Sequence, residues 1–147
     1  MYGPKAVGEV GLSKNVIAQL PANSIIIADK GFGTFFVAYT AINEGHDVLL
    51  RLTDVRAKQA LNGRVLKVDG ELPCTWNPAK VTQQSYPAIP NNAELCGRII
   101  KHTYHPKGSK PVKILLFTTL DLPVEQIVSL YALRWNIETD LRTIKTT

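Results

Sequence analysis

The chain has 147 residues, an apolar fraction of 45% and a net charge of +5. That apolar fraction can bury a sizeable core, which argues against wholesale disorder and favours one domain, or one domain with an insertion. No apolar run reaches about 18 residues, and the N-terminus has no apolar signal core, so the sequence predicts neither a membrane span nor export.

The first elements in chain order predict a βαβ unit. Ile25–Ala28 is a continuous apolar run, as expected of a strand buried on both faces. Residues Phe35–Glu44 read as a helix with Thr34 as its N-cap, and Asp47–Leu52 as a second buried strand. Such a unit implies parallel strands and a right-handed crossover.

The short "GFG" pattern at residues 31–33 invites a nucleotide-binding interpretation. However, Phe36 stands where a third glycine would be needed, and no Gly-Lys-Ser/Thr is present. The sequence therefore predicts neither a dinucleotide fold nor a phosphate-binding loop of the P-loop type.

Residues 62–113 differ from the rest of the chain in their spacing of prolines and in their charge. Six prolines punctuate short β-like runs such as "RVLKV" (64–68) and "GRIIKHTY" (97–104), which predicts an antiparallel β-rich insertion. This segment holds 8 Lys+Arg against 3 acids, whereas the remainder holds 9 against 9. All the excess positive charge therefore lies here, as expected of a surface that binds a polyanion.

The two cysteines of the chain, Cys74 and Cys96, also lie in this segment. They are too few for a disulfide scaffold and are expected to be reduced thiols in a cytoplasmic protein. His102 and His105 follow them, but no Cys-x-x-Cys is present and the spacing matches no common zinc finger. A zinc site is not favoured.

The last predicted elements are a strand, "VKILLFTTL" (112–120), and a long helix. Between Val124 and Lys145 there is no Gly or Pro, and Pro123 suits a first helical turn. At about 100° per residue, five apolar residues fall within roughly 80° and are expected to face the core. They are Leu130, Leu133, Ile137, Leu141 and Ile144.

Four polar residues of this helix share one edge, beside the apolar stripe. Tyr131, Arg134, Glu138 and Lys145 fall within roughly 60°. The ordinary interpretation is surface charge with an i,i+4 pair, although Arg134 before Glu138 is the less favourable order. The alternative is a site, because groups at the rim of a core are partly desolvated.

A second acidic residue, Asp29, supports the interpretation that these residues form a site. It follows the first strand, at the end where parallel sheets bind ligands, and the long helix must pack on the same sheet. If Asp29 and Glu138 converge, they could share Mg²⁺, which prefers oxygen ligands and bridges to phosphate. Arg134 and Lys145 would then hold neighbouring phosphates.

The long helix resembles the Tyr–Arg–Glu–Lys motif of bacterial insertion-sequence transposases of the IS-four class. Two residues separate Tyr131 from Arg134, three separate Arg134 from Glu138, and six separate Glu138 from Lys145. This spacing fits the motif at all four points.

Other segments extend the resemblance over about residues 20–147. "IIIADKGF" (25–32) resembles the block around the second catalytic Asp of this class, and "HDVLLRL" (46–52) resembles the strand that follows it. The basic β-rich segment resembles the insertion that the class places between its second Asp and its Glu.

The resemblance implies an α/β, ribonuclease-H-like core with an Asp–Asp–Glu triad and a two-metal Mg²⁺ site. The implied reaction is nicking of double-stranded DNA at transposon ends, then strand transfer by the freed 3′-hydroxyl. Asp29 would be the second catalytic carboxylate and Glu138 the third, both as metal ligands. Arg134 and Lys145 would contact DNA phosphates, supported by Tyr131, and the enzyme would act as a homodimer in a synaptic complex.

The chain departs from the class at the first catalytic Asp, which lies on an earlier strand of the family's core. Here the only acid before Asp29 is Glu9, in no strand context. We therefore expect a C-terminal fragment with a partial core (1–61 and 114–147) around the insertion (62–113). We expect it not to cut DNA alone, and its first strand to have an unpaired edge. The alternatives are a catalytically inactive DNA-binding fragment and an unrelated Mg²⁺-dependent nuclease.

Overall fold

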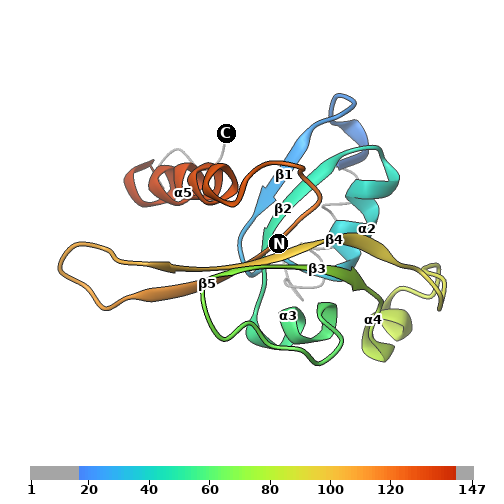
Figure 1. Cartoon of the computed structure of the whole chain (residues 1–147). Coiled ribbons are helices and arrows are strands. Elements are labelled where there is room, and N and C mark those ends of the chain that lie inside the picture. The colour runs from blue at the N-terminus through green and yellow to red at the C-terminus, as the bar shows by residue number, and fades with distance from the viewer. Residues whose placement is uncertain (1–16, 142–147) are drawn as a thin grey trace.

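The computed structural model describes the backbone of residues 17–141 and the side chains of residues 17–133. Within this range the chain forms one five-stranded sheet, in the order β1-β2-β5-β4-β3, with helices on both faces (Figure 1). The strands are β1 (Ile25–Ala28), β2 (Asp47–Arg51), β3 (Gly70–Trp76), β4 (Leu95–Tyr104) and β5 (Val112–Thr118). The helices that bear on the site are α2 (Phe35–Asn43), α3 (Asp54–Ala60), α4 (Lys80–Ser85) and α5 (Val124–Leu141).

The predicted α/β class and the βαβ unit are both confirmed. β1 pairs with β2 in parallel, from Ile25 opposite Asp47 to Ala28 opposite Leu50. Thr34 caps α2, because its hydroxyl oxygen accepts a hydrogen bond from the Val37 N–H at 3.2 Å. The expected burial of β1 is wrong in part. Ile25 is 46% exposed, because β1 is the last strand of the sheet over the described residues.

The antiparallel pairing predicted for residues 62–113 is confirmed for β3 and β4, which pair with each other, and β4 also pairs antiparallel with β5. β5 also pairs antiparallel with β2, so these strands share one sheet with the βαβ unit. The "RVLKV" run (64–68) is not a strand, which corrects that expectation. Its backbone is held instead by Lys101, whose ammonium donates to the carbonyls of Leu66 and Lys67. The division of the chain at residues 62 and 113 stays a prediction.

β3 was missed because Pro73 lies inside it. A proline lacks the N–H that a central strand must donate, but an edge strand can accommodate it. β3 is the other terminal strand of the sheet, where Pro73 stands opposite Arg98. The carbonyl of Pro73 accepts a hydrogen bond from the guanidinium of Arg64 at 3.3 Å.

Two apolar clusters form the core, one on each face of the sheet. The larger one includes α2 and α3, and the smaller one includes α5, which lies on the opposite side (Figure 1). Alternation along β2 divides them, since Leu50 belongs to the larger cluster and Leu49 to the smaller. None of the helices within residues 17–141 combines the length and apolar character needed to cross a bilayer.

The helix predicted after Pro123 is confirmed as far as Leu141, and residues 142–145 lie outside the described part. The predicted core stripe is wrong at Leu133, which is 60% exposed. Among residues 124–133 of α5, Ile127 and Tyr131 are buried, and Leu130 packs beside them. The helix is therefore rotated toward the edge that carries Tyr131, because the aromatic ring buries more apolar surface than the leucine would.

The structure distinguishes the two thiols. Cys74 is buried, and its pKa is raised to about 11, first by desolvation and then by the nearby Cys96 sulfur. Cys96 is exposed on the neighbouring strand. We predict that a thiol reagent at pH 8 modifies Cys96 rapidly and Cys74 only after unfolding, since about one in a thousand Cys74 side chains is then a thiolate. Mass spectrometry of the folded protein measures this, with Cys96→Ser as control. Rapid modification of Cys74 in the folded control would contradict the prediction.

Candidate active site

Asp29 begins the loop that leaves the carboxyl end of β1. One of its carboxylate oxygens, Oδ1, accepts a hydrogen bond from the Gly31 N–H at 3.0 Å. Its backbone carbonyl accepts another from the Phe32 N–H at 3.1 Å, which closes a tight turn. The turn therefore fixes the direction of the carboxylate. No partner of the second oxygen, Oδ2, is seen among the described residues.

Strand alternation indicates the face on which Asp29 lies. Ile27 packs in the cluster beneath α5, whereas Ala28 belongs to the cluster on the other face. The position after Ala28 returns to the α5 face. Since Ala28 pairs with Leu50, the next positions along the two strands are Asp29 and Arg51. Asp29 is thus at the end of the sheet, on the side that α5 covers.

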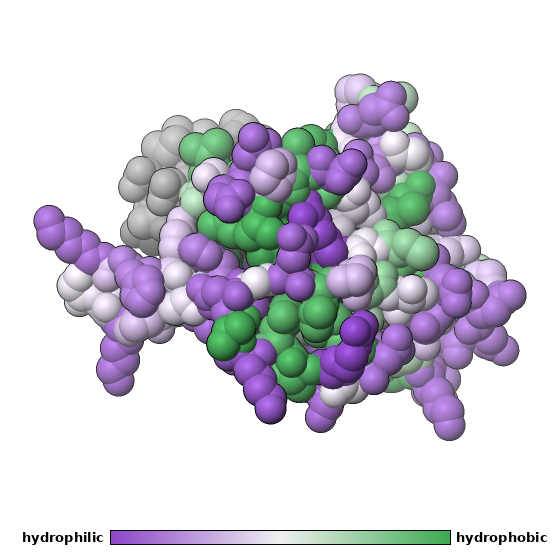
Figure 2. All heavy atoms as spheres, in the orientation of Figure 1, coloured by the Kyte–Doolittle hydropathy of each residue, from purple (hydrophilic) through white to green (hydrophobic). Residues whose placement is uncertain are grey.

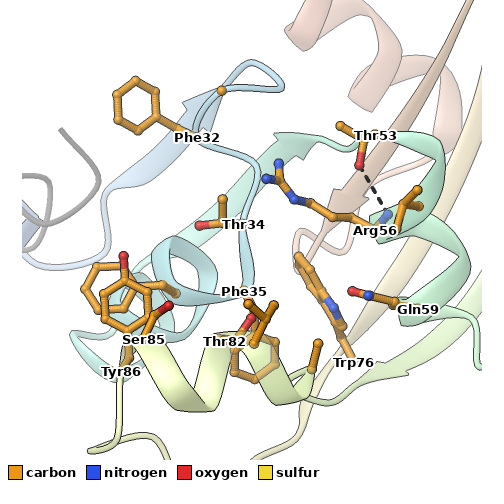
Figure 3. Close-up of a pocket in the computed structure, with 15 residues that line it drawn as sticks. Phe32, Thr34, Phe35, Thr53, Arg56, Gln59, Trp76, Thr82, Ser85 and Tyr86 are labelled. Atoms are coloured by element: carbon orange, nitrogen blue, oxygen red, sulfur yellow. Dashed lines mark hydrogen bonds between the residues drawn. The ribbon is translucent and has the colours of Figure 1, made fainter. Parts of the chain in front are cut away.

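A close backbone contact holds the far end of this loop. A Cβ at Gly33 would lie 2.0 Å from the backbone carbonyl oxygen of Arg51, so only glycine fits there. Arg56 of α3 adds a second restraint, since its Nη1 donates to the carbonyls of Lys30 at 2.9 Å and Gly33 at 3.3 Å. Figure 3 shows the Arg56 side chain reaching from α3 toward the loop.

Sequence reasoning missed these roles. The sequence signal for the role of Gly33 is the "GFG" pattern, which the sequence analysis related only to nucleotide binding. The same glycine also marks a close approach of two backbones between a strand and a helix. No sequence signal could have paired Arg56 with the carbonyls of residues 30 and 33, because the contact spans 23 to 26 positions.

A cleft of about 610 Å³ opens beneath the loop, on the face of the sheet opposite α5 (Figure 3). Its lining combines aromatic rings with hydroxyl groups and the Arg56 guanidinium. The principal lining residues are Phe32, Thr34, Phe35, Arg56, Trp76 and Tyr86. None of the described residues that line this cleft is a carboxylate, so they do not form an acidic metal site.

The other predicted site residues are on or beyond α5. Tyr131 is 3% exposed and packs with Leu49 and Ile100, in the cluster between α5 and the sheet. Glu138 lies in the same helix, seven residues and about 10 Å further along its axis. The side chains of Arg134 and Glu138, and the whole of Lys145, lie outside the described residues. Convergence of Glu138 with Asp29 therefore stays a prediction.

Over the residues described, no group of three or more His, Cys, Asp or Glu side chains is close enough to bind a metal. Cys74 and Cys96 are on adjacent strands, and the ring of His102 contacts Tyr104 at a centroid distance of 5.8 Å. A carboxylate with one oxygen fixed and the other directed elsewhere nevertheless fits a hard cation such as Mg²⁺. Asp29 and Asp47 both have one oxygen held by a hydrogen bond, but Asp29 lies at the carboxyl end of a parallel strand, where α/β sheets bind ligands.

The basic segment contains cations of two kinds. Arg98 bonds Glu71 at 2.7 Å and Lys101 holds two backbone carbonyls, so both serve the fold, whereas Lys113 lies 3.7 Å from Asp54 in an exposed ion pair. Lys107 and Lys110 are exposed in the loop that joins β4 to β5. This hairpin projects from the body of the protein, and its tip is covered with hydrophilic side chains (Figures 1 and 2). The tip therefore offers two exposed lysines to a partner, and the segment also holds the exposed lysines Lys67 and Lys80.

Comparison with known proteins gives one family. The family model described as transposase DDE domain matches residues 5–147. No curated protein matches the chain. The match covers all the elements described above, including the loop at Asp29 and the whole of α5.

The contact at Gly33 leads to a mutational prediction. Gly33→Ala should lower the free energy of unfolding by about 2 kcal/mol or more, because the added methyl group would displace either the loop or β2. Gly31→Ala is the matched control, since its Cβ would meet only the Asp29 carboxylate, at 3.3 Å. Urea unfolding measures both variants. Equal stability of the two would contradict the packing described here.

Proposed function

Because the chain belongs to the transposase DDE domain family and is thus a DNA transposase domain, we propose that it supplies two carboxylates of a magnesium-dependent site for DNA cleavage and strand transfer. The reaction is hydrolytic nicking at transposon ends, followed by attack of the freed 3′-hydroxyl on target DNA. The two carboxylates are Asp29 and Glu138.

The observation that carries the proposal is the fixed carboxylate of Asp29. Its Oδ1 is held by the Gly31 N–H, and strand alternation favours the α5 side of the sheet. Glu138 belongs to α5, and the burial of Tyr131 two turns earlier turns that side of the helix toward the sheet. These two facts support convergence of the carboxylates at one end of the sheet.

The residues have separate roles in this proposal. Asp29 and Glu138 hold Mg²⁺, which when bound would lower the pKa of an attacking water or hydroxyl and stabilise the leaving oxygen. Arg134 and Lys145 bind the phosphates that flank the cut, Arg134 with two parallel hydrogen bonds. Tyr131 supports them from within the apolar cluster beneath α5.

Metal binding tests the two carboxylates directly. We predict that Asp29→Asn and Glu138→Gln each weaken Mn²⁺ binding about tenfold or more, because each change removes a charged oxygen ligand. Isothermal titration calorimetry measures the affinity. Glu125→Gln, in the first turn of α5, is the control for loss of an acid on the same helix. Affinities equal to that of the control would reject the proposed site.

The first alternative is a DNA-binding domain without nuclease activity by itself. The number of matching carboxylates favours it. A transposase triad needs three carboxylates, and two acids of this chain match the motif. A nicking assay with Mg²⁺ or Mn²⁺ separates the alternatives. We expect no cleavage by this chain alone. Robust cleavage that disappears in Glu138→Ala would contradict this expectation and would mean that another acid of the chain completes the triad.

DNA binding itself is a property of the family, and we propose the tip of the β4–β5 hairpin as one contact surface. Exposed lysines bind backbone phosphates and release counterions, so binding weakens as salt rises. Lys101 is unsuitable for a test, since its ammonium holds two backbone carbonyls. The homodimer expected from the resemblance stays a prediction.

We predict that Lys107→Ala and Lys110→Ala each reduce the slope of log affinity against log salt by about 1, the value for one phosphate contact. Fluorescence anisotropy with duplex DNA at several salt concentrations measures the slope. Lys58→Ala, which removes one charge from α3, is the control. Slopes indistinguishable from the control would exclude the hairpin tip from the interface.

A further inference from the structure

We infer that Arg56 is a positioning residue that holds the Asp29 carboxylate in place through the backbone of the loop after β1. This inference rests on the proposed role of Asp29 as a metal ligand. Arg56 itself touches neither the metal nor the DNA in this proposal. Its guanidinium acts on the two carbonyls of residues 30 and 33.

The position of those carbonyls is the first reason. They lie on either side of Gly31, whose N–H holds Oδ1 of Asp29 at 3.0 Å. Lys30 precedes that N–H by one residue and Gly33 follows it by two. A single nitrogen, Nη1, bonds both carbonyls and thereby ties together the segment that presents the N–H. Loss of this tie would leave the Asp29–Gly31 bond in an exposed loop without a side-chain restraint.

The anchoring of Arg56 is the second reason. The hydroxyl oxygen of Thr53 caps α3 by accepting the Arg56 N–H at 3.2 Å (Figure 3). Ala57 and Ala60 of the same helix are buried against the sheet. The backbone of Arg56 is therefore fixed to the core, so its side chain links the loop to a rigid element. The Arg56 side chain lines the cleft, and its printed hydrogen bonds go to the two loop carbonyls.

The chemistry makes such a restraint matter. Displacing a reacting group by about 1 Å can slow an enzyme about a hundredfold, and residues behind a metal ligand typically contribute 10- to 100-fold to metal affinity. The restraint also depends on arginine. A lysine carries a single, more strongly hydrated ammonium, which is less suited to holding two carbonyls in fixed directions.

Arg64 provides a matched control. It also donates to two backbone carbonyls, through Nε to Leu61 at 3.1 Å and through Nη2 to Pro73 at 3.3 Å. Its bonds secure the turn after α3 and the edge of β3, away from Asp29. Arg64→Met therefore removes the same kind of restraint, and the same charge, without touching the loop at Asp29.

The experiment compares Arg56→Met, Arg56→Lys and Arg64→Met in the whole chain. Calorimetry with Mn²⁺ gives the affinity, thermal unfolding gives the stability, and amide hydrogen exchange gives the protection of the Gly31 N–H in metal-free protein. We expect Arg56→Met to weaken Mn²⁺ binding about tenfold and to speed Gly31 exchange, with Arg56→Lys intermediate. Arg64→Met should change Mn²⁺ affinity less than about twofold at a comparable loss of stability.

Asp29→Asn separates this inference from the proposed function. In the Asp29→Asn background, Arg56→Met should have no further effect on Mn²⁺ binding. If Asp29→Asn abolishes strong binding but Arg56→Met leaves both the affinity and Gly31 exchange unchanged, the positioning role is rejected and the site stands. Equal weakening by Arg56→Met and Arg64→Met would also reject it, as a general effect of stability. If Asp29→Asn leaves Mn²⁺ binding unchanged, the site is rejected and the positioning role with it.

Discussion

The close approach of Gly33 to the carbonyl of Arg51 is the constraint on which the site depends. It brings the chain from the end of β1 directly over the end of β2, and α2 begins two residues later. Because β1 and β2 pair in parallel, this crossing fixes the height of Asp29 relative to Arg51. A bulkier residue at position 33 would lift the loop, and with it the backbone that holds the Asp29 carboxylate.

The two faces of the sheet have different roles around this crossing. On one face α2 and α3 bury the larger cluster, and α3 supplies the arginine that ties the loop. On the other face α5 buries the smaller cluster and carries Glu138, the second carboxylate of the proposed site. The loop at Asp29 is the one segment that connects a support on the first face with the proposed chemistry on the second. The proposed site would therefore depend on packing on one face of the sheet as well as on charged groups on the other.

Helices and strands with a clear pattern of apolar residues could be predicted from the sequence. Elements whose position depends on contacts between distant residues could not. Residues 25–52 have apolar runs, a cap and a glycine stop, so β1, α2 and β2 were predicted nearly to the residue. β3 was missed because Pro73 is acceptable only at an edge, and edge position is a property of the whole sheet. The rotation of α5 was missed because Tyr131 and Leu133 compete for the core, which periodicity alone does not decide. Asp29 was found from its place after a strand, whereas its supports at Gly33 and Arg56 required the fold.

Pro73 also affects the border of the sheet at which another strand can pair. At the β3 edge it offers no N–H to an incoming strand, and Arg64 already occupies its carbonyl. At Pro73, therefore, that border of the sheet offers neither a donor nor a free acceptor to another strand. β1 forms the opposite border of the described sheet and is built from three isoleucines and an alanine, with no proline or charged residue to repel another strand. Of the two borders of the described sheet, the one beside Asp29 is therefore the less protected against an added strand, from the same polypeptide or from another.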